Sequence, residues 1–186
     1  MGGIFMTILL FGVSNVGKTE TGKLLAKSLN YDFYDLDDEV KKYLNITLKE
    51  FVSSGSLQER DQMRCKLIKK IILRKGNKVI AVTPLSYIQD IQRRLNDPTI
   101  LTIELFDSPQ NIFDRLVFSD ENDVVYRDDV YKNKHKSHYI SEIREDLKWY
   151  GFVFRDLKHH FDMNGESPKE VVADLIVKYQ LGKKED

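Results

Sequence analysis

The feature that most constrains this chain is a short apolar run that leads directly into a loop bracketed by glycines. Residues 7–11 read TILLF, and residues 12–19 read GVSNVGKT. An unbroken apolar run of this length predicts a strand that is covered on both faces. Apolar residues then recur at helical spacing over residues 18–29, so the order strand, loop, helix is predicted for this part of the chain.

The loop fits the pattern G-x-x-x-x-G-K-[ST], and each part has a task in binding a nucleoside triphosphate. The glycines let the backbone curl until N–H groups point inward at an anion, and the following helix adds the positive end of its dipole. Lys18 supplies a mobile charge for the β- and γ-phosphates, and the Thr19 hydroxyl suits Mg²⁺. We therefore predict that ATP binds at Gly12, Asn15, Val16, Gly17, Lys18, Thr19 and Glu20.

Strand and helix patterns alternate along the rest of the chain. Strands are predicted at residues 32–36, 78–82, 99–105 and 159–163, and helices at 38–43, 48–53, 58–74, 86–95, 108–118, 139–149 and from Ser167 onward. This alternation predicts an α/β fold of three layers, with a five-stranded, mostly parallel sheet and helices on both faces. We expect one domain over residues 1–186. The polar, aperiodic segment 119–137 is too long for a simple connection, so we predict that it is a lid.

Composition limits the partners that we expect for the chain. Apolar residues make up 41% and charged residues 31%, as in soluble globular proteins, and 29 basic residues balance 29 acidic ones. Because neither charge is in excess, we expect no nucleic-acid or membrane partner. Cys65 is the single cysteine, which excludes an internal disulfide and favours a reducing compartment. No stretch has the length of a membrane span. We expect a cytoplasmic monomer.

Acidic residues follow the second predicted strand, in the sequence DFYDLDD at residues 32–38. Ligands of open α/β sheets bind beyond the carboxyl ends of the strands, so we expect Asp35 and Asp37 at the site. Alternation along an extended chain would place both side chains on one side. One carboxylate could hold the water shell of Mg²⁺ while the other receives the proton of a substrate hydroxyl. The alternative is that Asp37 or Asp38 only caps the next helix.

The order of motifs over residues 12–60 resembles a known family. The loop is followed by the helix TGKLLAKSL, the Asp-x-Asp pair, the helix LKEFVSSG, and a glycine five residues before an arginine, Gly55 and Arg60. This order resembles the first third of shikimate kinases, small P-loop kinases with the nucleoside-monophosphate-kinase fold. The resemblance implies ATP as phosphoryl donor, Mg²⁺ as cofactor and a small hydroxylated, anionic acceptor. It also implies a substrate-binding helical region at about residues 37–62.

The resemblance implies roles for individual residues as well. Thr19 and Asp35 would hold magnesium, Lys18 would neutralise the phosphates, and Asp37 would act as base or orienter of the attacked hydroxyl. Arg60 would bind the acceptor's carboxylate, a bidentate task that suits a guanidinium. Three further arginines complete the expected site, namely Arg115 near the adenine, Arg127 in the lid and Arg144 as a second cation for the acceptor.

The sequence departs from the family pattern on the acceptor side and in the lid. The family has three consecutive glycines after its third strand, whereas this chain has Thr83, Pro84 and Leu85. Proline has no N–H to donate, and a leucine side chain would fill space that glycines leave open. Three residues after Arg60, where the family usually has an acidic residue, this chain has Met63. The Arg-Pro pair that is usual in the family's lid is also absent. We therefore expect the chemistry to be kept and shikimate to be a poor or altered substrate.

Three classes of function fit the loop motif. The first is a small-molecule kinase, either a shikimate kinase or a kinase of a related hydroxy acid, sugar acid or nucleoside. The second is a nucleotide-binding relative without catalysis, which the missing glycines favour and the retained site residues oppose. The third is a GTPase or motor-type NTPase. That class requires an apolar strand that ends in a magnesium-binding aspartate, whereas residues 79–83 end in Thr83, and no Asn-Lys-x-Asp motif for guanine occurs.

Overall fold

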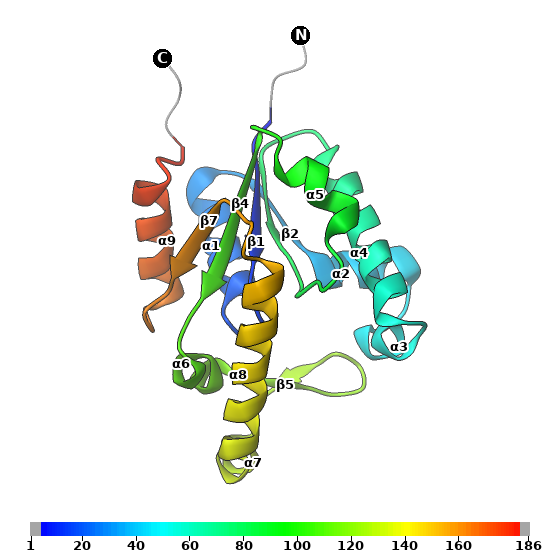
Figure 1. Ribbon diagram of the computed structural model, residues 1–186, viewed down its shortest axis with the longest axis vertical. Helices are drawn as coiled ribbons and strands as arrows, with labels where there is room; N and C mark the ends of the chain where they lie inside the picture. The colour runs from blue at the N-terminus through cyan, green and yellow to red at the C-terminus, as the bar shows by residue number, and fades with distance from the viewer. Residues whose placement is uncertain (1–4, 183–186) are drawn as a thin grey trace.

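The computed structural model describes residues 5–182, and its centre is one five-stranded sheet (Figure 1). The sheet has the order β2-β3-β1-β4-β7, and all neighbouring pairs are parallel. Its strands are β1 (Thr7–Phe11), β2 (Asp32–Asp35), β3 (Lys78–Ala81), β4 (Ile100–Phe106) and β7 (His159–Asp162). The predicted five-stranded α/β sheet is confirmed, and it is parallel throughout rather than mostly parallel.

Helices cover both faces of this sheet, as the alternating pattern predicted (Figure 1). The first face packs against α1 (Lys18–Leu29), α6 (Pro109–Arg115), α8 (Lys136–Val153) and α9 (Pro168–Lys178). The second face packs against α2 (Leu36–Leu44), α3 (Leu48–Ser53), α4 (Leu57–Ile72) and α5 (Gln89–Leu95). The helix predicted from Ser167 onward is α9, and a capping box opens it, because Ser167 and Glu170 each bond to the other's backbone N–H.

Strand β1 explains why two apolar cores form. Its side chains alternate in direction, so Ile8 and Leu10 enter one core while Leu9 and Phe11 enter the other. All four are fully buried. A continuous apolar run at the centre of a parallel sheet therefore holds the two helical layers together, and the loop after it emerges at the carboxyl edge of the sheet.

The helix predicted at residues 86–95 begins later than expected. Helix α5 starts at Gln89, because the backbone N–H groups of Ser86 and Tyr87 donate to the carboxylate of Asp61 instead of entering a helical turn. The preceding residues therefore form an irregular segment that is bound from the side by α4. Smaller boundary differences occur in α2, which begins at Leu36, in α6, which ends at Arg115, and in α8, which spans Lys136–Val153.

The predicted lid, residues 119–137, has more regular structure than its sequence suggested. Strands β5 (Phe118–Ser119) and β6 (Val125–Tyr126) form an antiparallel hairpin, and α7 (Asp129–Lys134) follows. The hairpin tip contacts α3, where the Asp123 carboxylate accepts the backbone N–H of Leu48 at 2.7 Å. Aromatic contacts of Phe118 with Tyr126, Tyr131 and Tyr139 provide a local apolar cluster, although these residues follow no helical or strand period in the sequence.

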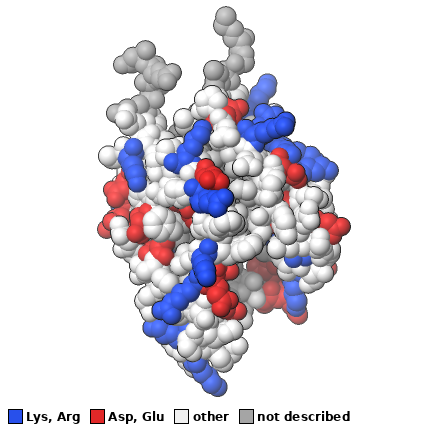
Figure 2. Space-filling view, viewed as in Figure 1, with Lys and Arg blue, Asp and Glu red and all other residues white. Residues whose placement is uncertain are grey.

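Charges of both signs are mixed over the face shown in Figure 2, where neither lysine and arginine nor aspartate and glutamate dominates. This mixture agrees with the balanced composition of the chain. In the part that the structure describes, no helix combines the length and apolar character needed to cross a bilayer.

Candidate active site

The glycine-bracketed loop lies at the carboxyl edge of the sheet, between β1 and α1. Gly12 has a φ of 139° and Gly17 a φ of 116°, a region of backbone conformation that favours glycine. A Cβ atom on Gly12 would lie 2.3 Å from the backbone oxygen of Leu105. Glycine at position 12 is therefore required for the loop to pack against β4.

Lys18 opens α1 and points back over the loop. Its ammonium donates to the backbone oxygens of Gly12 at 2.9 Å and Val13 at 2.7 Å. Burial lowers the pKa of Lys18 to about 8, against the opposing attraction of Asp37 and Asp35. The lysine is thus held among backbone dipoles at the place where the loop would receive phosphate groups.

Asp35 joins the loop to the second strand. Its Oδ2 accepts the Thr19 hydroxyl at 2.7 Å, and its Oδ1 accepts the backbone N–H of Asp37 at 3.0 Å. The second contact makes Asp35 the N-cap of α2. The expectation that Asp35 and Asp37 alternate along an extended strand is therefore wrong, because α2 begins directly after Asp35 and Asp37 lies in its first turn. The alternative, that an aspartate caps the next helix, is correct, but the capping residue is Asp35 rather than Asp37 or Asp38.

The oxygen atoms at this point suit a magnesium ion. The Thr19 hydroxyl, the Asp35 carboxylate and Asp37 lie together, and buried Oδ1 of Asp37 accepts no hydrogen bond from any residue within 5–182. Mg²⁺ prefers such hard oxygen ligands and usually takes few from the protein and the rest from phosphates and water. In the same described range, no cluster of three or more His, Cys, Asp or Glu side chains forms a complete metal site. The residues therefore fit an ion that is shared with a nucleotide.

Asp37 borders the cavity in an unusual electrostatic environment. Burial raises the pKa of its carboxyl group and outweighs the lowering effects of a hydrogen bond from Thr83 and the charges of Arg64 and Lys18. The nearest Arg64 nitrogen is 3.6 Å from Oδ1 of Asp37. A carboxylate whose pKa is raised by burial is a better acceptor for the proton of a hydroxyl group.

One cavity of about 430 Å³ brings the loop, the acids and the lid together. Its lining comprises Ser14, Asn15, Lys18, Thr19, Asp35, Asp37, Lys41, Leu48, Ala81, Thr83, Pro84, Val117, Phe118, Ser119, Asp123 and Val125. The lid hairpin forms one wall, which agrees with its predicted place. Leu85, which we expected to fill the acceptor space, is instead fully buried in the core beside α4 and α5.

Eight predicted residues are absent from this lining. Four of them belong to the loop or contact it, namely Gly12, Val16, Gly17 and Arg115. The other four lie elsewhere. Arg60 is half-buried and donates to the backbone oxygens of Ser54 at 3.0 Å and Gly55 at 2.9 Å. Arg127 is exposed between β6 and α7. Arg144 borders a different hollow between α6 and α8, and Glu20 is exposed beside Lys23. The structure thus brings the predicted nucleotide residues together, except Glu20 and Arg127, and leaves the predicted acceptor arginines apart from Asp37.

Arg115 contacts the loop from α6. Its guanidinium donates to the backbone oxygen of Val16 at 3.3 Å and pairs with buried Asp107 at 2.6 Å. Asp107 also accepts the backbone N–H of Gly165 at 3.2 Å. These contacts place Arg115 beside the loop Gly12–Thr19 and next to the turn that follows β7, while its place near the adenine stays a prediction.

Sequence reasoning missed Asp61 and Arg64. Both lie on α4 in the stripe of buried positions that also holds Cys65 and Ile68. Charged residues at positions i and i+3 of an otherwise apolar helical stripe indicate a buried ion pair, so the period of α4 could have revealed them. Asp107 gave no such indication, because one acid at the end of a strand is common.

These features define the class of protein as a P-loop phosphotransferase. The family model described as "Shikimate kinase" matches residues 14–180. The chain belongs to the shikimate kinase family. Members of this family are ATP-dependent phosphotransferases that act on a hydroxyl group.

Individual relatives agree with this assignment. The chain is 27% identical over 176 residues to a shikimate kinase of Thermodesulfovibrio yellowstonii, a match that covers 93% of this chain and 94% of that protein. A crystal structure of shikimate kinase from Bacteroides thetaiotaomicron superposes with a TM-score of 0.78, at 20% identity, over 95% of this chain and 99% of that chain. The latter comparison supports the fold.

Another relative is much longer than this chain. The pentafunctional AROM polypeptide of Schizosaccharomyces japonicus is 31% identical over 75 residues, which is 40% of this chain and 5% of that protein. The chain therefore spans a small part of that relative's length.

Proposed function

We propose that this chain is an ATP- and Mg²⁺-dependent kinase that phosphorylates a hydroxyl group of a small polyhydroxylated acid, with shikimate as the first acceptor to test. The observation that carries the proposal is the meeting of Lys18, Thr19, Asp35 and Asp37 in one cavity beneath the lid hairpin. Phosphoryl transfer needs little covalent chemistry from a protein, and these residues supply the charge and the positioning it does need.

The proposed reaction assigns each group a task. The acceptor hydroxyl donates its proton to Asp37, and its oxygen forms a bond to the γ-phosphorus as the bond to the β–γ bridging oxygen breaks. Lys18 moves from its backbone partners to the phosphates and stabilises the charge that develops there. Thr19 and Asp35 would hold Mg²⁺, which neutralises phosphate charge when bound. The lid hairpin excludes water, so that ATP is not lost to hydrolysis.

The acceptor side is the part of the proposal that needs the most testing. Arg60 remains our predicted partner for the acceptor's carboxylate, with Arg144 as the second cation, although neither borders the cavity. Thr83 and Pro84 stand where the family has glycines. The loss of backbone contacts there would weaken shikimate binding by ~2–4 kcal/mol, or ~30- to 1,000-fold.

A coupled assay with shikimate and gluconate as acceptors distinguishes an active kinase from a nucleotide-binding relative without catalysis. We expect the wild type to turn over at least one of them, Asp37→Asn to lose ~10²–10⁴-fold in kcat, and Arg60→Ala to raise the KM of the acceptor. Turnover that survives Asp37→Asn unchanged would contradict the role of the acid. Tight ATP binding without turnover of any hydroxy acid, sugar or nucleoside would instead favour the non-catalytic relative.

We also propose that the protein acts as a monomer in the cytoplasm, with ATP and its acceptor as partners. The single cysteine, which suits a reducing compartment, supports this location. The balanced charge supports the absence of a nucleic-acid or membrane partner. Sedimentation of the purified protein in the presence of ATP tests the oligomeric state.

A further inference from the structure

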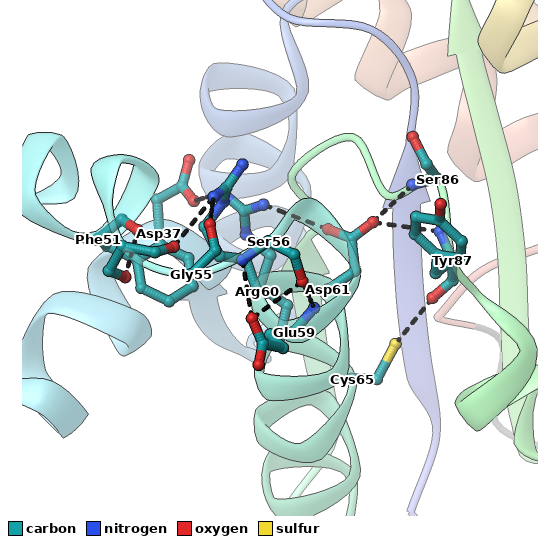
Figure 3. A network of polar contacts seen from close by, with 12 residues as sticks. Asp37, Phe51, Gly55, Ser56, Glu59, Arg60, Asp61, Cys65, Ser86 and Tyr87 are labelled. Atoms are coloured by element: carbon teal, nitrogen blue, oxygen red, sulfur yellow. Dashed lines mark hydrogen bonds and ion pairs between the residues drawn. The ribbon is translucent and has the colours of Figure 1, made fainter.

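Helix α4 holds the irregular segment Thr83–Tyr87 through two buried side chains (Figure 3). The carboxylate of Asp61, which is fully buried, accepts the backbone N–H groups of Ser86 at 2.9 Å and Tyr87 at 3.1 Å. One turn further along α4, the thiol of Cys65 donates to the backbone oxygen of Tyr87 at 3.6 Å. The segment that replaces the family's glycines is therefore fastened from the side by this helix.

Arg64 connects the same carboxylate to the active-site acid. Its Nη1 lies 3.3 Å from Oδ1 of Asp61, and its Nη2 lies 3.6 Å from Oδ1 of Asp37. The guanidinium also stacks 5.1 Å from the ring centre of Phe51 in α3. With 5% of its surface exposed, Arg64 is a buried cation placed between two carboxylates.

The segment Thr83–Tyr87 closes this network into a ring. At its far end from Tyr87, Thr83 lines the same cavity as Asp37 and lowers the pKa of the Asp37 carboxyl group. Asp37 thus contacts Arg64 on one side and Thr83 on the other, while Arg64 and the segment meet again at Asp61. Lys18 from α1 and Asp35 from β2 are the other charged groups that act on Asp37.

We propose that Arg64 and Asp61 are positioning residues, which together fix the orientation of Asp37 and hold Thr83–Tyr87 as the acceptor wall of the cavity. This proposal rests on the kinase function proposed above. In a chain without flexible glycines at the wall, a side-chain ring supplies the rigidity that a phosphoryl-transfer site requires. Neither residue borders the cavity, so both act through Asp37 and the segment rather than on the substrate.

The charges of the ring suggest a discriminating experiment. Arg64→Met alone leaves Asp61 as a buried carboxylate without its cation, so this variant is expected to unfold more easily. The double variant Asp61→Asn with Arg64→Met removes both charges and keeps side chains of similar volume. We expect the double variant to regain the denaturation midpoint of the wild type, while kcat stays ~100-fold lower and the KM for ATP is unchanged.

A control ion pair with a more exposed arginine joins α2 to the residues just after α4. Arg74, just after α4, pairs with Glu39 of α2 at 2.8 Å, away from the cavity. Arg74→Met should lower the denaturation midpoint, and its combination with Glu39→Gln should restore it. Both single variants and the double variant should keep kcat within ~2-fold of the wild type. Arg64→Lys keeps one positive charge without the fork that reaches both carboxylates, so its kcat should lie between the wild type and Arg64→Met.

The two outcomes of the double variant are distinct. If stability and turnover recover together, Arg64 serves stability alone and the positioning proposal is overturned. If turnover stays low in a protein of normal stability, the proposal is supported.

A second measurement keeps the test independent of the acceptor. If the wild type phosphorylates neither shikimate nor gluconate, the proposed function fails in that assay while the ring can still be tested by amide hydrogen exchange. The N–H groups of Ser86 and Tyr87 should exchange at least ~10-fold faster in Asp61→Asn than in the wild type, and those of the control pair's variants should not. Equal exchange rates in Asp61→Asn and the wild type would overturn the proposal.

Discussion

The nucleotide side and the acceptor side of the cavity are built in different ways. The nucleotide side comes from eight consecutive residues, Gly12–Thr19, with Asp35 as a nearby support. The acceptor side is assembled from α2, α4, the segment Thr83–Tyr87 and the lid hairpin. A site formed by one continuous loop depends on local backbone geometry. A site formed by distant segments depends on contacts between side chains, and other residue types can replace those side chains. The difference shows why this chain keeps the family's loop and alters its acceptor wall.

The largest effect is expected at the nucleotide side. Lys18→Ala removes the charge that stabilises the transferred phosphoryl group, and we expect kcat to fall by at least ~10³-fold, or about 4 kcal/mol of barrier. The protein should stay folded, because the substitution removes a buried ammonium rather than a packed apolar group. Steady-state kinetics with circular dichroism measures both. Lys23→Ala, an exposed residue of the same helix, should have little effect, and normal turnover of Lys18→Ala would show that the loop does not bind the phosphates as proposed.

Glycine substitutions sharpen the contrast between a strained loop and an ordinary helix. Gly12→Ala places a Cβ atom 2.3 Å from a backbone oxygen at positive φ, so we expect it to lower the free energy of unfolding by about 2–4 kcal/mol. Gly151→Ala, within α8, meets no atom within 4 Å and should raise it by about 0.5–1 kcal/mol. Chemical denaturation of both variants measures the opposite signs. A tolerated Gly12→Ala would mean that the loop can shift away from Leu105.

The lid contact gives a smaller effect on the acceptor side. Asp123→Gly keeps the positive φ of the hairpin tip and removes the carboxylate that accepts the N–H of Leu48. The loss of one such hydrogen bond corresponds to about 1 kcal/mol, so we expect a ~5-fold higher KM for the acceptor and faster amide exchange at Leu48. Asn122→Gly on the same turn controls for added flexibility. ATP should slow exchange throughout residues 119–137, and no change on ATP addition would contradict the lid assignment.

The smallest effect on function is expected at Cys65. Burial raises the pKa of its thiol to about 12, and the nearby Asp90 and Asp61 add to the shift. At pH 8 the folded protein therefore contains almost no thiolate, and a thiol reagent should react with Cys65 only when the protein unfolds. The reaction rate should rise with denaturant in parallel with the unfolding transition. Rapid labelling of the native protein would show that α4 opens locally, which would weaken the proposed ring around Asp61.

The sequence predicted most of the fold because its information is local. The apolar run at β1, the loop motif and the capped last helix each occupy consecutive residues with a fixed period or spacing. Helix α5 was placed too early because the N–H groups of Ser86 and Tyr87 bond to Asp61, which lies 25 and 26 residues away along the chain. Long-range hydrogen bonds of this kind leave no periodic trace in the sequence.

In the candidate site, too, the features set by local sequence were predicted and those set by long-range contacts were not. The loop residues and Asp35 were placed correctly relative to one another because a motif fixes their spacing. The proposed task of Arg60 came from resemblance, and its observed partners are the backbone oxygens of Ser54 and Gly55. Arg64, one turn further along α4, contacts Asp37 instead. A shift of one helical turn changes which arginine of α4 reaches Asp37, and no motif at this position fixes the turn.

The hydrogen bond between Trp149 and Ser86 has a consequence for fluorescence measurements on this protein. The indole N–H of Trp149, the single tryptophan of the chain, donates to the hydroxyl of Ser86 at 3.2 Å. Ser86 belongs to the segment that Asp61 holds. Indole emission depends on the polarity and hydrogen bonding around the ring, so we expect the emission of Trp149 to change when the proposed acceptor wall moves. Stopped-flow fluorescence without any attached dye would measure that change when an acceptor is added.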